Sequence, residues 1–246
     1  MIGYISGLDN NEQMVLITLE IPEDAITNID RPKIRFSEYA MYYCNKAKVI
    51  DISYLNDTKL NTCKRYVYTK HPDTYTVNEE IETDYTGSSI NCKKLIQFYL
   101  SKEPLKLLLD NNRQGKYYLY NNDGSVDRIS EYTDNKLNGK TQILKNDGFY
   151  LDQNYKDDNL LSTLLYNAND ELFTGDFFEY YPTGQIACKK AYINGILQGK
   201  TIYYGLDSRI IAEMHYENNL LSGTKIEYDN DMNIISKIVY KDGIEL

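Results

Sequence analysis

The fold is decided by Gly175-Asp-Phe-Phe-Glu-Tyr-Tyr-Pro-Thr-Gly184 together with Tyr192-Ile-Asn-Gly195. The same layout returns after 24 residues, from Gly175 to Gly199 and again from Gly199 to Gly223. The earlier glycines Gly115 and Gly139 also stand 24 residues apart. The segment from about Gln114 to Leu246 is therefore a tandem array, whose units are expected to be stabilised mainly by stacking on their neighbours.

Each unit has the pattern of a β-hairpin, with two short runs separated by turn residues. Five residues after each glycine stands a large apolar or aromatic side chain: Tyr120, Leu144, Tyr180, Tyr204 and Tyr228. Seventeen residues after it stands a second tyrosine series: Tyr132, Tyr192, Tyr216 and Tyr240. Turn residues such as Asp123-Gly124 and Asn194-Gly195 separate the runs. Runs of about seven residues between such turns are typical of paired strands and too short for long helices.

Alternation within the strands predicts two different faces, one aromatic and aliphatic and the other polar. We expect the recurring aromatic side chains to project from one face and to form a candidate protein-binding surface. Its predicted members are Tyr120, Phe178, Tyr180, Tyr204, Tyr228, Tyr192, Tyr216 and Tyr240. The competing interpretation is that these rings only stabilise the sheet.

Two features interrupt or end the array. The half-length unit from Thr163 to Thr174 breaks the 24-residue spacing before Gly175 restores it, and we interpret it as a degenerate hairpin. The last unit runs to Leu246, where an open strand edge would need a cap or a partner. A homodimer formed through this terminal repeat is one expectation.

The first 112 residues lack the repeat spacing. Strands are predicted at residues 14–21, 48–53, 65–69 and 95–100, and a short helical turn at 22–25. A helix capped by Ser101 and running through Leu109 is expected to join the two halves. The predicted fold class is mainly β, with a small α+β amino-terminal domain (1–112) followed by an elongated antiparallel sheet of β-hairpin repeats (113–246).

The repeat units, above all 175–184 and 192–195, resemble the MORN repeat in the variant found in bacterial antitoxin-like and giant-virus proteins. The resemblance covers about 130 residues of this chain. It implies an elongated, twisted antiparallel sheet used for protein contacts, dimerisation or, in some members, membrane association. Outer units depart from the pattern, because Asp207-Ser208 and Asn218-Asn219 stand where the family often has glycine.

The amino-terminal residues resemble an uncharacterised domain of nucleocytoplasmic large DNA viruses, of mimivirus-like origin. The similar stretches are Leu19–Ala25, Asn45–Ile52, Tyr75–Glu79, Cys92 and Phe98–Glu103. The family's Gly-Ile-His run after the cysteine is replaced by Lys93-Lys94-Leu95-Ile96, so a role that depends on that histidine is not expected to transfer.

Charge and hydropathy limit the classes of partner that can be expected. The 27 basic and 36 acidic side chains give a net charge of -9, and the longest basic runs are pairs such as Lys64-Arg65. Nucleic acid is therefore not expected as a partner, because its recognition needs several clustered cations. No stretch of roughly 18 apolar residues is present, so no integral membrane segment is expected. The expected location is intracellular and soluble, or the virion or host cytoplasm if the chain is viral.

Chemistry-bearing residues are sparse. The chain has two histidines, His71 and His215, and four scattered cysteines, Cys44, Cys63, Cys92 and Cys188. They match no zinc spacing, and the chain lacks nucleophile-elbow, P-loop and dinucleotide motifs. We therefore expect a protein that is not an enzyme, with no catalytic residues, no metal and no cofactor.

These observations favour a protein–protein interaction or structural protein that uses the tyrosine-rich sheet, such as a minor capsid component of a giant-virus virion or a host-interaction scaffold. The alternative is an antitoxin-like inhibitor of a basic partner protein, since the repeat region has an acidic surplus. A third possibility, a carbohydrate- or lipid-directed enzyme, would require a deep pocket with converging carboxylates.

Overall fold

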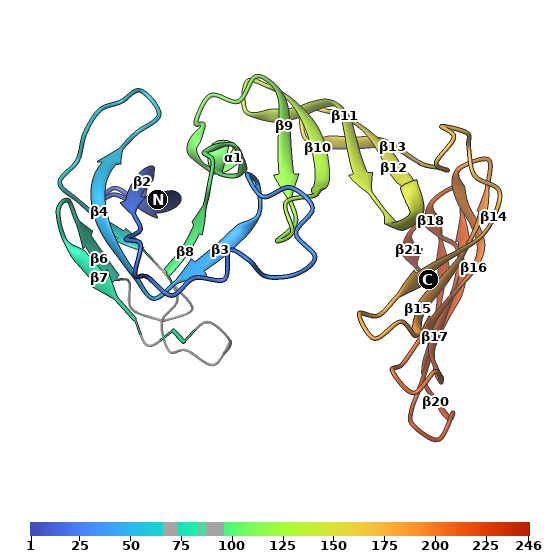
Figure 1. Cartoon of the computed structure of the whole chain (residues 1–246). Coiled ribbons are helices and arrows are strands. Elements are labelled where there is room, and N and C mark those ends of the chain that lie inside the picture. Colours follow the sequence, from blue (N-terminus) through green and yellow to red (C-terminus); the bar gives the residue numbers. More distant parts are fainter. Residues whose placement is uncertain (66–72, 84, 87–95) are drawn as a thin grey trace. The chain divides into compact units, whose positions relative to one another are not determined.

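The computed structural model describes residues 1–65, 73–83, 85–86 and 96–246 (Figure 1). The chain forms two compact units, Met1–Gly139 and Lys140–Leu246. Strands dominate both units and every sheet is antiparallel, so the prediction of a mainly β protein is confirmed. The domain boundary at residues 112 and 113 stays a prediction.

The first unit is built around an eight-stranded sheet. Its strands are β1 (Ile2–Leu8), β2 (Met14–Glu20), β3 (Met41–Cys44), β4 (Lys46–Ser53), β5 (Thr62–Arg65), β6 (Asp73–Thr76), β7 (Glu80–Glu82) and β8 (Ile96–Tyr99). The order is β3-β8-β1-β2-β4-β7, with β5 paired to β1 and β6. The strands predicted at 14–21 and 48–53 are confirmed, and the one at 95–100 corresponds to β8. Most of the strand predicted at 65–69 lies outside the described residues.

Alternation along these strands builds the core of the first unit. In β1 every second residue is buried, and in β2 Val15, Ile17 and Leu19 are buried. Because neighbouring strands oppose residue to residue, the buried sets meet on one side of the sheet and form a single cluster with Val49 and Phe98. The predicted helical turn at 22–25 is a single hydrogen-bonded turn, in which the Ala25 amide donates to the Pro22 carbonyl over 3.1 Å.

The predicted helix after residue 101 is present but shorter than expected. A 3-10 turn, η1 (Glu103–Leu105), leads into α1 (Lys106–Leu109). Ser101 does not cap it, because the cap residue is Lys102 with no side-chain hydrogen bond, and the buried Ser101 hydroxyl has no hydrogen-bond partner among the residues that the structure describes. The helix is held instead by burial of Leu105 and Leu109 against Leu16 of β2.

The first hairpin of the array belongs to the first unit. It consists of β9 (Gly115–Tyr120) and β10 (Val126–Thr133). The backbone amides of Arg35 and Phe36 donate to the Asp123 carbonyl in its turn, over 2.9 and 3.2 Å, and the Tyr39 ring lies 4.7 Å from that of Tyr120. The loop before β3 thus caps this hairpin. The boundary between the two units falls inside the next strand, β11 (Lys136–Leu144).

The second unit continues with the short turn η2 (Asn146–Gly148), then β12 (Tyr150–Lys156) and β13 (Asn159–Tyr166), which pair as a hairpin. Leu165 of β13 is fully buried together with Phe177 and Tyr192 of the following sheet, and Phe149 and Phe173 pack around them. These aromatic contacts hold the β12–β13 hairpin against the start of that sheet.

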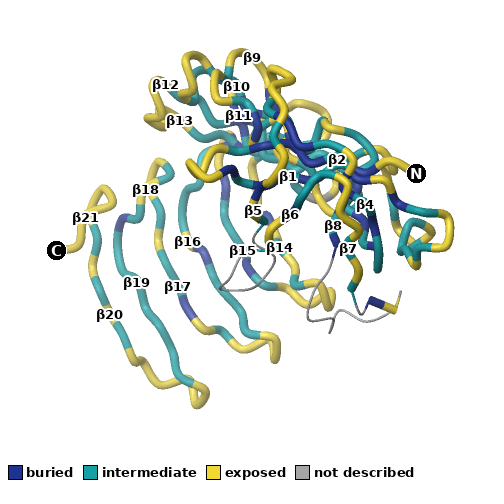
Figure 2. Tube along the Cα trace, turned by 90° about the vertical axis from the view of Figure 1, so that its left-hand side faces the viewer, coloured by how far each residue is buried: buried dark blue, intermediate teal, exposed yellow. Residues whose placement is uncertain are grey.

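The largest element of the second unit is an eight-stranded meander, here called the C-terminal sheet (Figure 2). Its strands are β14 (Gly175–Tyr180), β15 (Ile186–Ile193), β16 (Ile196–Tyr204), β17 (Ile210–Glu217), β18 (Leu220–Leu221), β19 (Gly223–Tyr228), β20 (Ile234–Lys241) and β21 (Ile244–Glu245). The prediction of one elongated sheet through the whole array is wrong, because β13 and β14 belong to different sheets. The half-length unit explains the break: after β13 the chain forms a turn closed by a single bridge between Tyr166 and Leu172.

Candidate protein-binding face

The strand register decides which tyrosines share a face of the C-terminal sheet. Tyr192 lies opposite Gly175, Tyr216 opposite Gly199 and Tyr240 opposite Gly223. Directly opposed residues in an antiparallel pair project to the same side of a sheet. These six residues therefore define one side, here called the glycine face.

The tyrosines of the other series lie on the opposite side. Tyr180, Tyr204 and Tyr228 come five residues after those glycines in unbroken strands, so alternation turns them away from the glycine face. They oppose Ile186, Ile210 and Ile234, and this side is here called the isoleucine face. Phe178, opposite Lys189, lies on it as well.

The predicted single surface is therefore wrong in its geometry. Phe178, Tyr180, Tyr204 and Tyr228 share the isoleucine face, whereas Tyr192, Tyr216 and Tyr240 share the glycine face. The reason is the pairing. Gly175 lies opposite Tyr192, which is 17 residues later, so residues an even number of positions after Gly175 in the first strand share a face with residues an odd number of positions after it in the second strand. Tyr120 belongs to the first unit, where it lies opposite Val126 and against Tyr39.

A β-bulge recurs at the same place in three hairpins of the C-terminal sheet, β14–β15, β16–β17 and β19–β20. The register shifts between Glu179 and Tyr180, between Tyr203 and Tyr204, and between Glu227 and Tyr228. At such a bulge two residues of one strand oppose a single residue of its partner. Each of these tyrosines thus faces two consecutive residues, which are Ile186 and Ala187, Ile210 and Ile211, and Ile234 and Ile235.

The bulges leave a line of apolar side chains on the isoleucine face, of which four are exposed and two, Tyr204 and Tyr228, are half-buried. We name it the Tyr–Ile strip, made of Tyr180, Ile186, Tyr204, Ile211, Tyr228 and Ile235. Tyr180 is 50% exposed, Ile211 45% and Ile235 65%. Ile211 and Ile235 belong to this side because each precedes a residue of the glycine face, Ala212 and Ser236 respectively.

The glycine face is more deeply buried at its β14 end. Tyr192 is only 6% exposed, and its ring meets the Phe177 ring edge-on with centroids 6.3 Å apart. Burial raises the pKa of Tyr192 to about 12. Tyr192 was predicted to bind a partner, but it is a core residue. A partner could not reach its ring unless the β14 end of the sheet unfolded.

The glycine face also holds a compact ion cluster. The Lys190 ammonium donates to the Glu179 carboxylate over 2.8 Å, and Lys145 approaches the other oxygen at 3.4 Å. Burial opposes the charged form of Glu179, but the hydrogen bond from Lys190 and the charges of both lysines outweigh it, so its pKa lies below the usual value. Each group has an opposite charge beside it, and the cluster is best described as a structural tie between the strands.

Charges on the isoleucine face alternate across the sheet. Successive opposed residues form one row across six strands: Phe178, Lys189, Ile202, Glu213, Ile226 and Lys237. Within the chain Lys189 pairs with Asp176 and Lys200 pairs with Glu213, both over 2.7 Å. This row lies two residues along the strands from the Tyr–Ile strip, so the apolar strip has an ordered charged border.

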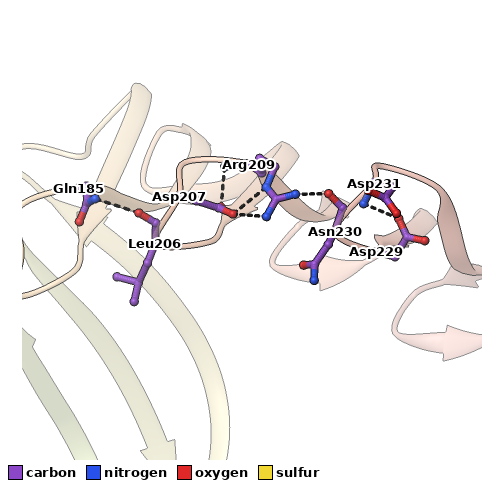
Figure 3. A network of polar contacts seen from close by, with 7 residues as sticks. All are labelled: Gln185, Leu206, Asp207, Arg209, Asp229, Asn230 and Asp231. Carbon is purple, nitrogen blue, oxygen red and sulfur yellow. Dashed lines mark hydrogen bonds and ion pairs between the residues drawn. The ribbon is translucent and has the colours of Figure 1, made fainter.

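The hairpin turns on the other side of the strip are tied to one another (Figure 3). The Gln185 amide donates to the Leu206 carbonyl of the next turn over 2.8 Å, and the Arg209 guanidinium donates to the Asn230 carbonyl of the turn after it. Arg209 also bonds Asp207 and holds the pKa of that carboxyl below its usual range. The turns therefore form a connected rim beside the strip.

The remaining reactive side chains are isolated. Cys44, Cys63 and Cys188 are buried, and burial raises the pKa of their thiols to about 12, 11 and 11. His215 lies on the isoleucine face opposite Lys200. His71 and Cys92 lie outside the described residues. In the part of the chain that the structure describes, no group of three His, Cys, Asp or Glu side chains could hold a metal ion.

Sequence reasoning missed the isoleucines that complete the strip. Ile210-Ile211 and Ile234-Ile235 are adjacent apolar pairs at the same repeat position, and such a pair interrupts strict alternation. That interruption is the signal of a bulge, and it could have indicated that both members of each pair face a tyrosine.

None of the helices in the described residues has the length and apolar composition of a membrane-spanning segment. No protein-family model matches this chain, and no curated protein matches it in sequence. The resemblance to MORN repeats and to the viral domain therefore stays a prediction from the residues quoted above.

Proposed function

We propose that this protein is a non-enzymatic, protein-binding scaffold that acts through the isoleucine face of the C-terminal sheet. The observation that supports it is the Tyr–Ile strip, in which large apolar side chains remain exposed although they stand on paired strands. Contiguous exposed apolar surface with a polar border is typical of protein-interaction sites. Tyrosine adds a hydroxyl and loses little conformational entropy on binding.

The alternative role, packing within the sheet only, fits the glycine face better. There Tyr192 is buried with Phe177 and Leu165 and contributes to the core. On the isoleucine face Tyr180, Ile211 and Ile235 retain about half of their surface or more. Complete burial of an exposed apolar side chain is worth roughly 1.5–3 kcal/mol, so covering the exposed half of each of these side chains would add about half of that, and a partner protein can supply this burial.

The rigidity of the face favours recognition over catalysis. The strip stands on six successive paired strands, and the turns beside it are joined by Gln185 and Arg209. A prearranged surface loses less entropy when it binds, which favours affinity and specificity. The proposed role is therefore presentation of a fixed surface, as in a structural or recruiting protein.

The test is affinity purification of the tagged protein from its native source, followed by mass spectrometry. The strip variant is Tyr204→Ala combined with Ile211→Ala, and the matched control is Tyr216→Ala on the glycine face of the same strand pair. We expect the wild type and the control to recover the same partner and the strip variant to lose it. Equal recovery by all three proteins, with folding verified by circular dichroism, would refute the proposal.

A second candidate is inhibition of a basic partner protein. It is favoured by Asp229 and Asp231, which lie in the turn between the strands that hold two strip residues, Tyr228 and Ile235. Carboxylates beside an apolar strip would attract a basic protein and speed its association at low salt. A recovered partner with a basic surface and an association rate that falls steeply with salt would support this candidate, and a rate insensitive to salt would exclude it.

A further inference from the structure

The alternating row on the isoleucine face is complementary to itself. Lys189 and Glu213 lie on β15 and β17, one strand to either side of Ile202 on β16. Strands are about 4.8 Å apart, so each charge lies roughly 5 Å from the line of β16. A two-fold axis parallel to β16 and passing over it would place Lys189 of one copy opposite Glu213 of the other, twice.

The same axis brings apolar residues against apolar residues. On β16, Ile202 and Tyr204 would each meet their own counterpart. Phe178 on β14 would meet Ile226 on β19, and Tyr180 would meet Tyr228, because these strands lie two positions to either side of β16. Lys200 also lies on β16, and its ion pair with Glu213 at 2.7 Å offsets the charge that it would bring near the axis.

We propose that the partner of the isoleucine face is a second copy of this chain, packed sheet against sheet about a two-fold axis over β16. This inference rests on the proposed function and names the partner. A symmetric dimer uses the same patch on both subunits, so the patch must be complementary to itself, and a + − pair placed symmetrically about apolar residues meets that requirement. Sheets that pack face to face keep their strands within about 30° of each other. Such a small rotation displaces residues little near the axis, so Lys189 and Glu213 of opposite copies remain facing each other.

The available area is sufficient for a dimer of modest stability. The contact would be about 24 Å wide across five overlapping strands and about 23 Å long along six to eight residues of each strand. A flat patch of these dimensions has an area on the order of 550 Å² per subunit, and projecting side chains increase it. Both subunits together thus bury at least roughly 1,100 Å², which is near the lower limit of specific interfaces. The competing axis over β19 would pair Glu213 with Lys237 but would overlap fewer long strands, since β21 has two residues.

The test measures molecular mass by sedimentation over a range of protein concentrations. We expect the mass of the wild type to rise with concentration from 28.6 kDa toward twice that value. Lys189→Glu alone and Glu213→Lys alone should each place like charges opposite one another at two positions in the dimer. Each should raise the protein concentration at which half of the chains are dimeric by tenfold or more. The double exchange, Lys189→Glu with Glu213→Lys, should restore dimerisation.

Lys237→Glu is the matched control, because it reverses a charge in the same row outside the overlap about β16. It should leave the protein concentration at which half of the chains are dimeric unchanged. A protein that stays monomeric throughout, or a dimer weakened by Lys237→Glu but not by Lys189→Glu, would overturn the proposal. Neither result would decide the proposed scaffold function, which is tested by loss of the recovered partner in the Tyr204 and Ile211 variant.

Discussion

Tyr216 lies directly opposite Gly199 where β17 pairs with β16. The same pairing of a tyrosine with a glycine recurs between Tyr192 and Gly175. Gly199 has a φ of +100°, a conformation that residues with a Cβ rarely adopt. A glycine at this position therefore permits a backbone conformation that a residue with a Cβ would adopt only under strain, which gives a physical reason for the spacing of glycines in the array.

Gly199→Ala should destabilise the second unit by about 1–3 kcal/mol, because alanine is strained at a positive φ. An added Cβ would meet only the Cβ of Ala191 at 3.6 Å, so the cost arises from the backbone and not from a clash. Urea unfolding measures it. The matched substitution Gly205→Ala should cost less, because Gly205 does not have a positive φ and the one close contact of the added Cβ, at 2.9 Å, is with the flexible end of the Asp207 side chain. Its contact with Ile211 Cγ2, at 3.5 Å, is an ordinary one, and equal costs would contradict this explanation.

Equivalent tyrosines of the glycine face should differ in their contribution to stability. Tyr192→Ala should cost about 3–5 kcal/mol, since it opens a cavity among Phe173, Phe177 and Leu165. Tyr240→Ala at the same repeat position should cost less than half of that, because Tyr240 is only half-buried. The measurement is the free energy of unfolding of both variants, and similar losses would show that the burial difference is not energetically important.

The repeat spacing was enough to predict hairpins, because turns with Asn, Asp and Gly between alternating runs have few other solutions. It was not enough to assign faces. A face depends on the register between strands, which the sequence reveals only through pairs such as Ile210-Ile211 that interrupt the alternation. The predicted binding set therefore combined Tyr204 with Tyr216, although they point to opposite sides.

The 24-residue spacing breaks where one sheet ends, but the sequence alone does not show that the break separates two sheets. The half-length unit from Thr163 to Thr174 was expected to be a degenerate hairpin within one ribbon, and it instead ends one sheet before the next begins. The burial of Leu165 against Phe177 and Tyr192 depends on packing between strands of two different sheets. Local spacing contains no information about such packing.

The ion cluster on the glycine face should make stability depend on pH. The pKa of Glu179 is below its usual value of 4.5 in the folded protein, so its charged form adds stability above the unfolded pKa, and this stability is lost as the pH falls through the folded pKa. Glu179→Gln should be less stable than the wild type at neutral pH, because Lys190 loses its partner. The difference should narrow below about pH 4.5. Unfolding at several pH values measures it, with the exposed Glu245→Gln as a control that leaves the profile unchanged.

The link between successive turns gives the last prediction. Arg209 donates to the Asn230 carbonyl and bonds Asp207, so it joins the turn after β16 to the turn after β19 (Figure 3). Arg209→Ala should leave global unfolding nearly unchanged, because the pair lies at the surface and is screened by water. It should nevertheless speed hydrogen exchange at the amides of Asp231 and Asn233, whose bonds to the Asp229 carboxylate depend on the conformation of that turn. The control is Arg113→Ala in the first unit, which should leave those two amides unaffected, and unchanged exchange in Arg209→Ala would show that each turn holds its conformation alone.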